Sequence, residues 1–322
     1  MKIAFLISAG RFPSGILEEL SAQLPQHQLI HWPRGESSPA TDIEVLLVLG
    51  EVTAAQMARQ TKLALIQTVT AGYEEIDIDA ASELGIWVSF APSEVTGSAA
   101  SVAEFAVLLM LGASRHVQQV VHLRENSAGS LGIAPALGGK TVCIVGLGNI
   151  GRLLVDRLRP FGVRMVAADH HPDRAPADVQ AFSSERLHTA VAEADYVVVC
   201  ARAGRENENL IDRAAMETMK QGAILINIAR GSLIDENALF DFVKSGHIAA
   251  AGLDVLKSSP DDATSPLVDL PQILITPHIA SATDLTFRGT LNYIKQVVET
   301  FAAGEKPTSV LNAPAHPRRL LR

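Results

Sequence analysis

Residues 141–171 constrain the fold of this chain more than any other stretch, because they join two apolar runs through a glycine-rich turn. The first run, TVCIV, leads directly into Gly146, Gly148 and Gly151, and an amphipathic stretch follows that ends near Gly162. The second run, RMVAAD, comes next. Short apolar runs separated by enough residues for one helix are typical of neighbouring parallel strands. The stretch therefore predicts a strand, a tight turn, a helix and a parallel strand.

The same alternation extends over both halves of the 322-residue chain, a length that suits two domains. Continuous runs rich in Val, Ile and Leu indicate strands buried on both faces. We predict an α/β fold with two doubly wound parallel-sheet domains, one formed by residues 1–98 and 286–322 and the other by residues 99–285. A long helix over 98–123 separates two series of expected strands, namely KIAFLIS, EVLLVLG, LALIQTVT and GIWVSF before it, and TVCIVG, RMVAAD, DYVVVC, AILINIA, IAAAGLDV and QILITPH after it. A final helix over 283–303 precedes a proline-containing tail.

Charge and cysteine content narrow the classes of function. The formal net charge of -8 is spread along the chain, so neither a nucleic acid nor an anionic membrane is expected as a partner. The longest apolar run, 105–113, is too short to cross a bilayer, and the N-terminus lacks the features of a signal peptide. Cys143 and Cys200 favour neither a disulfide scaffold nor a zinc site. We therefore expect a soluble, cytoplasmic protein with a small-molecule partner and no metal.

The three glycines have G-x-G-x-x-G spacing, and their place between a strand and a helix makes the pattern specific for dinucleotide binding. Gly146 allows a tight turn, Gly148 lets the backbone approach a pyrophosphate, and Gly151 lets helix and strand pack closely. Asp169, at the end of the second strand, is placed to accept hydrogen bonds from the adenosine ribose. A carboxylate there favours NAD over NADP, whereas the cationic residues within 170–174 keep NADP as the alternative.

Three further segments follow expected strands in the second half, namely LINIARGSLIDENAL, AAAGLDVLKSSP and LITPHIAS. Together with VGLGNIG, VTAGYEEIDIDAASELGIWV and SVAEFAVLLML, they make nearly the whole chain resemble the D-2-hydroxyacid dehydrogenase family. The resemblance implies a Rossmann domain inserted in a discontinuous flavodoxin-like substrate domain, with substrate in the cleft between them. It also implies a homodimer packed through the dinucleotide domain. The expected reaction is NAD(H)-dependent interconversion of a small 2-keto acid and its D-2-hydroxy acid.

The resemblance assigns the chemistry to residues at these strand ends. Arg230 of NIARG matches the arginine that binds the carboxylate and keto oxygen of the substrate, a task that suits a planar fork of donors. His278 of TPHIA matches the acid/base that exchanges a proton with the substrate oxygen. Asp254 of GLDV matches the aspartate that holds the nicotinamide carboxamide. The remaining matches are Asn149, Ile150 and Ala229 for the cofactor, and Ala71, Gly72 and Ser98 for the substrate; Tyr73 either lines the pocket or packs in the core.

The chain departs from the family pattern after GLDV. Family members have a glutamate before a proline, which pairs with the catalytic histidine, and an ungapped comparison places Ser259 at that position. A serine can orient the imidazole but supplies no negative charge that would raise its pKa. Asp261, Asp262 or Glu94 is an alternative source of the carboxylate.

We expect the reductive activity to fade at a lower pH than in relatives that have this acid. The protonated imidazole gives the proton to the substrate. If the pKa of His278 is lower, the imidazole loses its proton at a lower pH, and reduction stops there. The pH profile of reduction for wild type and Ser259→Glu measures this, and the apparent pKa of the basic limb should rise in the variant. An unchanged basic limb would contradict the hypothesis.

A second hypothesis comes from the same resemblance, because the family also contains NAD-binding transcriptional corepressors that depend little on turnover. The missing glutamate is compatible with such an NAD-sensing binding protein. Retention of both Arg230 and His278 favours the enzyme.

Overall fold

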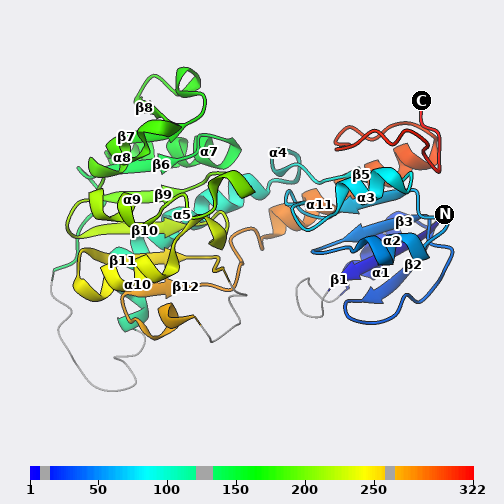
Figure 1. The fold of residues 1–322 in the computed structure, drawn as a ribbon, viewed down its shortest axis with the longest axis horizontal. Coiled ribbons are helices and arrows are strands. Elements are labelled where there is room, and N and C mark those ends of the chain that lie inside the picture. The colour runs from blue at the N-terminus through cyan, green and yellow to red at the C-terminus, as the bar shows by residue number, and fades with distance from the viewer. Residues whose placement is uncertain (8–14, 121–132, 258–264) are drawn as a thin grey trace. The chain divides into compact units, whose positions relative to one another are not determined.

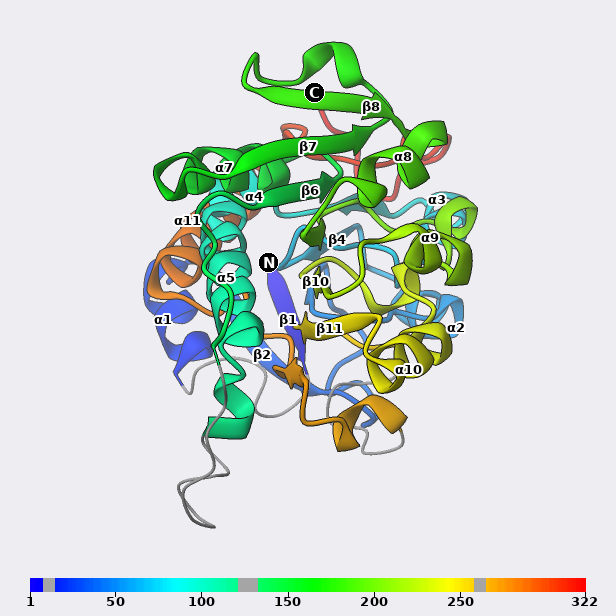
Figure 2. The same ribbon diagram turned by 90° about the vertical axis from the view of Figure 1, so that its left-hand side faces the viewer.

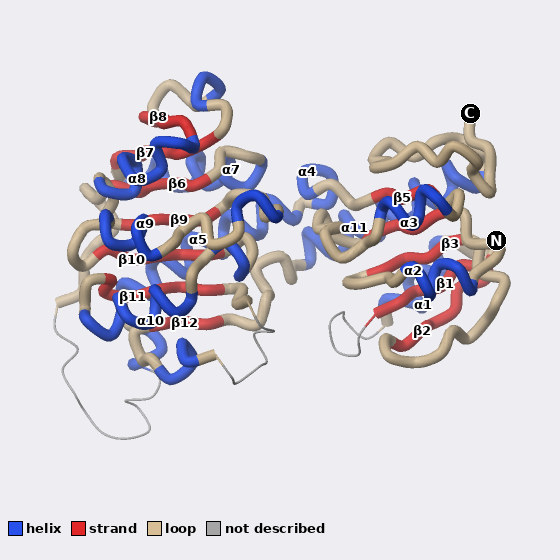
Figure 3. Tube along the Cα trace, in the orientation of Figure 1, coloured by secondary structure: helices blue, strands red, loops and turns tan. Residues whose placement is uncertain are grey.

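The computed structural model describes two compact units of the chain, over residues 1–7, 15–120, 133–257 and 265–322. Unit 1 comprises Met1–Ser98 and Asp284–Arg322, and unit 2 comprises Ala99–Thr283. The sequence prediction lets the chain return to the first domain at residue 286, whereas unit 1 resumes at Asp284. Figures 1 and 3 show a layer of strands with helices packed on it in each unit.

Unit 1 is built on a five-stranded parallel sheet with the strand order β2-β1-β3-β4-β5, which is the flavodoxin-like doubly wound order. Apolar side chains of α1 and α11 pack on one face, and those of α2 and α3 pack on the other. The strands are β1 (Lys2–Ile7), β2 (Gln28–Pro33), β3 (Val45–Val48), β4 (Leu65–Thr68) and β5 (Trp87–Ser89). The helices are α1 (Ile16–Gln23), α2 (Ala54–Arg59), α3 (Ile78–Glu83), α4 (Ser93–Thr96) and α11 (Asp284–Ala302).

Unit 2 is built on a seven-stranded parallel sheet with the order β12-β11-β10-β9-β6-β7-β8, the Rossmann order with one added strand. Helices α5 and α7 cover one face and α8, α9 and α10 cover the other, as Figure 2 shows. The strands are β6 (Thr141–Val145), β7 (Arg164–Asp169), β8 (Val179–Ser183), β9 (Tyr196–Val199), β10 (Ala223–Asn227), β11 (Ile248–Leu253) and β12 (Ile273–Ile275). The helices are α5 (Ser98–Ser114), α7 (Asn149–Leu158), α8 (Leu187–Ala192), α9 (Arg213–Thr218) and α10 (Glu236–Ser245), with 3-10 turns η1 (Arg159–Phe161), η2 (Pro172–Arg174), η3 (Ser184–Arg186), η4 (Arg205–Asn207), η5 (Gly231–Leu233) and η6 (Pro266–Asp269).

The predicted fold class is confirmed, since both units are doubly wound parallel α/β structures. Two strands were not predicted, β2 and β8, and each lies at an edge of its sheet. An edge strand buries less of its surface, and both strands mix buried with exposed positions instead of forming one apolar run.

One predicted boundary was wrong. The long helix expected over 98–123 is interrupted: α5 ends at Ser114, a turn follows in which His116 adopts a left-handed backbone with φ 50°, and residues 117–120 are helical again. Residues 121–123 of this prediction lie outside the described residues. The expected C-terminal tail follows α11 and packs on unit 1: the backbone N–H of Leu311 donates to the carbonyl of Val88, and the Trp87 indole donates to the carbonyl of Arg319. Within the described ranges, no helix combines the length and apolarity needed to cross a membrane.

Candidate active site at the carboxyl edge of the second sheet

The carboxyl ends of five neighbouring strands in unit 2 lie in register. Val145 of β6 pairs with Val199 of β9, which pairs with Asn227 of β10. Asn227 in turn pairs with Leu253 of β11, and Leu253 with Ile275 of β12. Ligands of open parallel sheets bind outside this edge. The segments predicted to bind cofactor and substrate therefore leave the sheet side by side.

The glycine-rich turn connects β6 to α7 in the way its sequence predicts. Gly146 has φ 98°, and an added Cβ would lie 2.7 Å from Cα of Ala201, so both conformation and space require glycine. A Cβ on Gly151 would overlap the carbonyl oxygen of Gly146, which explains the close approach of helix and turn. Gly148 is the N-cap of α7, is exposed, and has no protein atom within 4 Å of an added Cβ.

This turn fits a dinucleotide pyrophosphate. The first backbone N–H groups of an α-helix have no acceptor within the helix and carry the positive end of its dipole. The N-cap Gly148 offers no side chain to cap them, and its open side lets a ligand approach the backbone. Asn149 is exposed and Ile150 is half-buried beside it. The residues present therefore fit NAD at this turn.

Asp169 lies at the end of β7 and is partly exposed. Its Oδ2 accepts a hydrogen bond from the backbone N–H of Leu147 at 2.7 Å, and its Oδ1 accepts one from the backbone N–H of His171 at 2.8 Å. The carboxylate is thus fixed against the glycine-rich turn. Since each carboxylate oxygen can accept about two hydrogen bonds, acceptor capacity for ribose hydroxyls is retained.

Arg230 follows β10 on a turn that is shaped by Asn227. The Asn227 side chain is 1% exposed; its Oδ1 accepts from the N–H of Ala229 at 3.0 Å, and its Nδ2 donates to the carbonyl of Arg230 at 2.8 Å. The half-exposed Arg230 guanidinium donates to the carbonyl of Ala229. Gly231 comes next, and an added Cβ there would overlap backbone atoms of Leu256, so the loop after β11 lies directly on this turn.

His278 follows β12 and is exposed. Its φ of 54° is left-handed, a conformation that costs a residue with a Cβ roughly 1–2 kcal/mol. Its backbone N–H donates to the carbonyls of Asp254 and Thr276, at 2.9 and 3.0 Å. Two strand spacings of about 4.8 Å separate β12 from β10, so the loops bearing His278 and Arg230 begin roughly 10 Å apart.

Asp254 lies between these loops, at the end of β11, and its side chain is 1% exposed. Its Oδ1 accepts from the Thr276 hydroxyl at 2.6 Å and from the N–H of Ile279 at 2.9 Å, while its Oδ2 accepts from the N–H of Ala280 at 3.0 Å. Its own N–H donates to the carbonyl of Asn227 at 2.9 Å. The predicted residues Ala229, Arg230, Asp254 and His278 are therefore joined by a continuous hydrogen-bond network.

Ser259 lies outside the described residues, as do Asp261 and Asp262. The two described residues that bound this segment, Lys257 and Ser265, both contact Glu236 of α10. Its Oε1 accepts from the N–H of Lys257 at 2.6 Å, and its Oε2 accepts from the Ser265 hydroxyl at 3.2 Å. The replacement for the family glutamate stays a sequence prediction.

Ala71 and Gly72 lie in unit 1, on the loop after β4, and both are half-buried. Side chains bind carbonyls along this loop: the Thr68 hydroxyl donates to Thr70 at 2.7 Å, and the Thr70 hydroxyl donates to Gly72 at 3.3 Å. Tyr73 packs its ring against Phe90 with centroids 5.3 Å apart, so packing accounts for part of its role.

Ser98 and Glu94 lie near the end of the first segment of unit 1. Ser98 begins α5, and its hydroxyl accepts from the Thr96 hydroxyl at 3.2 Å. Glu94 is exposed on α4. Their roles toward substrate and imidazole stay sequence predictions.

Asn227 and Thr276 are the residues of this network that the motif comparison did not single out. Asn227 is the last residue of β10 and Thr276 directly follows β12, and each lies two residues before a predicted site residue, Ala229 or His278. A polar residue at the end of an apolar run is a usable signal, because an amide that is buried there, as in Asn227, must find partners in the adjoining loops.

The fold and this edge define a two-domain dinucleotide-binding protein of the dehydrogenase class. The family model for "D-isomer specific 2-hydroxyacid dehydrogenase, NAD binding domain" matches residues 107–280. The glyoxylate reductase of Thermococcus litoralis is 33% identical over 293 residues, which cover 87% of each chain. The chain therefore belongs to the D-2-hydroxyacid dehydrogenase family, and unit 2 contains its NAD-binding domain.

Two further relatives agree with this assignment. The D-3-phosphoglycerate dehydrogenase of Mycobacterium leprae is 36% identical over 252 residues, which cover 76% of this chain and 46% of that protein. This chain thus spans about half the length of several curated relatives that it matches. The crystal structure of the TT0316 protein from Thermus thermophilus superposes with a TM-score of 0.82 at 28% identity, covering 97% of this chain and 100% of that chain.

Proposed function

We propose that this protein is an NAD(H)-dependent reductase that converts small 2-keto acids to D-2-hydroxy acids. The observation that carries the proposal is the network at the carboxyl edge of β10, β11 and β12, which joins the Arg230 turn to the His278 loop. Names of relatives such as glyoxylate reductase and hydroxypyruvate reductase support this substrate class.

The proposed roles follow from the chemistry of each group. NADH, when bound at the glycine-rich turn, supplies the hydride. Arg230 binds the carboxylate and keto oxygen of the substrate through its planar fork of donors. His278 donates a proton to the oxygen that becomes the hydroxyl. The N–H groups of Ala71 and Gly72 bind the substrate carboxylate, and Ser98 contributes to the substrate rim.

The experiment that tests this function is a panel of glyoxylate, hydroxypyruvate, pyruvate and phenylpyruvate, assayed by the loss of NADH absorbance. We expect turnover of at least one acid, with NADH preferred over NADPH because of the Asp169 carboxylate. Tight NADH binding without turnover of any acid would instead support an NAD-sensing binding protein.

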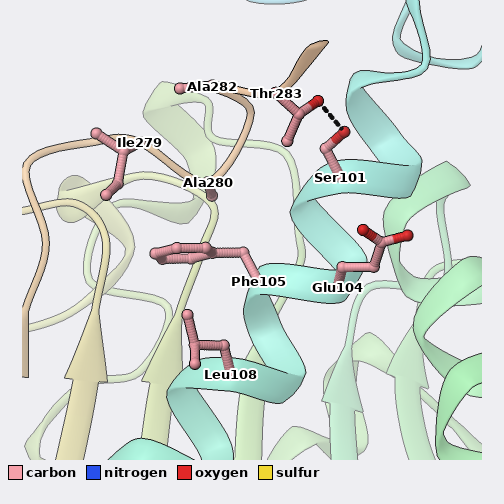
Figure 4. A pocket seen from close by; sticks show the side chains of 8 residues that line it. All are labelled: Ser101, Glu104, Phe105, Leu108, Ile279, Ala280, Ala282 and Thr283. Atoms are coloured by element: carbon pink, nitrogen blue, oxygen red, sulfur yellow. Dashed lines mark hydrogen bonds between the residues drawn. The ribbon is translucent and has the colours of Figure 1, made fainter. Parts of the chain in front are cut away.

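A homodimer is part of the same proposal. Unit 2 has a groove of about 480 Å³ lined by α5 and by the loop after β12. Figure 4 shows the side chains that line it. Its lining is mainly apolar: Phe105 is half-buried, and Leu108 and Ile279 are 55% and 41% exposed. Exposed apolar side chains gathered in one place favour a protein interface, and a second copy of this chain is the partner that family resemblance implies.

We predict that Leu108→Glu weakens or abolishes this dimer, because burying a carboxylate in an apolar interface is unfavourable. Sedimentation velocity should give twice the chain mass of 34.3 kDa for wild type and the chain mass for the variant. Leu320→Glu is the matched control, since Leu320 is 82% exposed and lies in unit 1. Equal masses for wild type and Leu108→Glu would rule out this face as the interface.

A cytoplasmic location is also proposed. Cys143 and Cys200 are free thiols, and burial raises the pKa of Cys143 to about 12. Such a thiol is protonated and unreactive, which agrees with a structural role in a reducing compartment.

A further inference from the structure

Three residues that bracket His278 share one buried acceptor. The hydroxyl of Thr276 and the N–H groups of Ile279 and Ala280 all donate to the carboxylate of Asp254, at 2.6, 2.9 and 3.0 Å. Figure 4 shows Ile279 and Ala280 on the loop beside α5. The carboxylate is 1% exposed, so these bonds are shielded from competing water. The loop is therefore fixed on both sides of the histidine by one side chain.

The backbone of His278 needs such support. Its φ of 54° is disfavoured for any residue with a Cβ, and conformations of this kind persist only where the surroundings enforce them. The Asp254 main chain also holds the loop, because its carbonyl accepts a hydrogen bond from the backbone N–H of His278 at 2.9 Å. Asp254 thus contacts the loop before, at and after His278.

We infer that Asp254 is a positioning residue, whose buried carboxylate holds the His278 loop in the conformation that presents the imidazole to substrate. This inference rests on the proposed acid/base role of His278. It differs from the nicotinamide contact that family resemblance implies for Asp254. A carboxylate has about four acceptor sites, and three are occupied by the loop.

The two roles predict different kinetics for Asp254→Asn. The amide has the size of the carboxylate but offers one acceptor oxygen, so one of the loop donors must face an NH2 group. If Asp254 positions His278, kcat falls about 100-fold, because a small misplacement of a catalytic group costs that much. The Kd of NADH, measured by fluorescence titration, then stays within about threefold of wild type.

Thr276 provides a matched pair of variants. Thr276→Val removes the hydroxyl that donates to Asp254 and should lower kcat about tenfold, whereas Thr276→Ser keeps the hydroxyl and should restore kcat close to the wild-type value. Neither variant changes a group that is proposed to contact the cofactor.

Hydrogen exchange of peptides that cover residues 275–282 gives a readout that does not depend on turnover. The amides of His278, Ile279 and Ala280 should exchange at least about tenfold faster in Asp254→Asn, while the β10 amides keep their protection. A weaker Kd for NADH with kcat retained would overturn the inference, and so would unchanged exchange of the loop. If the wild-type protein shows no turnover but the loop exchanges faster in Asp254→Asn, the proposed reaction is refuted, whereas the inference that Asp254 holds the His278 loop is supported.

Discussion

Replacing His278 by asparagine is expected to lower kcat for 2-keto acid reduction by about 10²- to 10⁴-fold, the usual contribution of a general acid/base. Asparagine is the informative substitute because the backbone at this position is left-handed, with φ 54°. Among residues with a Cβ, asparagine tolerates this conformation well. The variant therefore removes the imidazole and keeps the loop, which alanine would not do as cleanly.

Two measurements separate loss of chemistry from loss of structure in His278→Asn. The Kd of NADH should be unchanged, because the proposed dinucleotide contacts are made by the turn between β6 and α7. His188→Asn is the matched control, since His188 is also exposed and in unit 2 but lies on α8. Turnover by His278→Asn at the wild-type rate would show that another group gives the proton.

The central strands of both sheets could be predicted from the sequence because burial on both faces requires continuous apolar runs. The strands β2 and β8, each at one edge of its sheet, lack this constraint, whereas β5 and β12 at the opposite edges keep apolar runs. In β2 only Trp32 is buried, and in β8 Val179 and Phe182 are buried among polar neighbours. The end of α5 at Ser114 was missed for a related reason: the apolar spacing continues past it, and a left-handed residue at His116 leaves no mark in periodicity.

The sequence allowed us to predict the types of the candidate site residues and the strands that they follow. It did not allow us to predict their hydrogen-bond partners. The sequence shows an aspartate after β11 and a histidine after β12. It does not show that the aspartate is buried and accepts three hydrogen bonds from Thr276, Ile279 and Ala280. That arrangement depends on the registers of β11 and β12, which place the two loops side by side. Asn227 was overlooked for the same reason, since its contacts with Ala229 and Arg230 form only in the folded turn.

Gly148→Ala and Gly151→Ala should separate cofactor binding from folding, although the two glycines belong to one motif. A Cβ on Gly148 meets no protein atom within 4 Å, and its φ of -69° suits alanine. Gly148→Ala should therefore unfold at the wild-type urea concentration. Its methyl group occupies the side from which a pyrophosphate approaches the backbone, so the Kd of NADH should rise about 10- to 100-fold, that is about 1.4–2.8 kcal/mol.

Gly151→Ala, in contrast, should lower the stability of the fold. Its Cβ would overlap the carbonyl oxygen of Gly146 and lie 3.3 Å from Cγ2 of Ile144, so α7 must move away from β6. Overpacking of this kind costs about 1–3 kcal/mol, and the midpoint of urea unfolding should fall accordingly. Equal losses of stability in both variants would mean that Gly148 is required by the fold itself. A wild-type Kd for NADH in Gly148→Ala would mean that no ligand approaches the turn at this residue, and the pyrophosphate site would have to be placed elsewhere along the sheet edge.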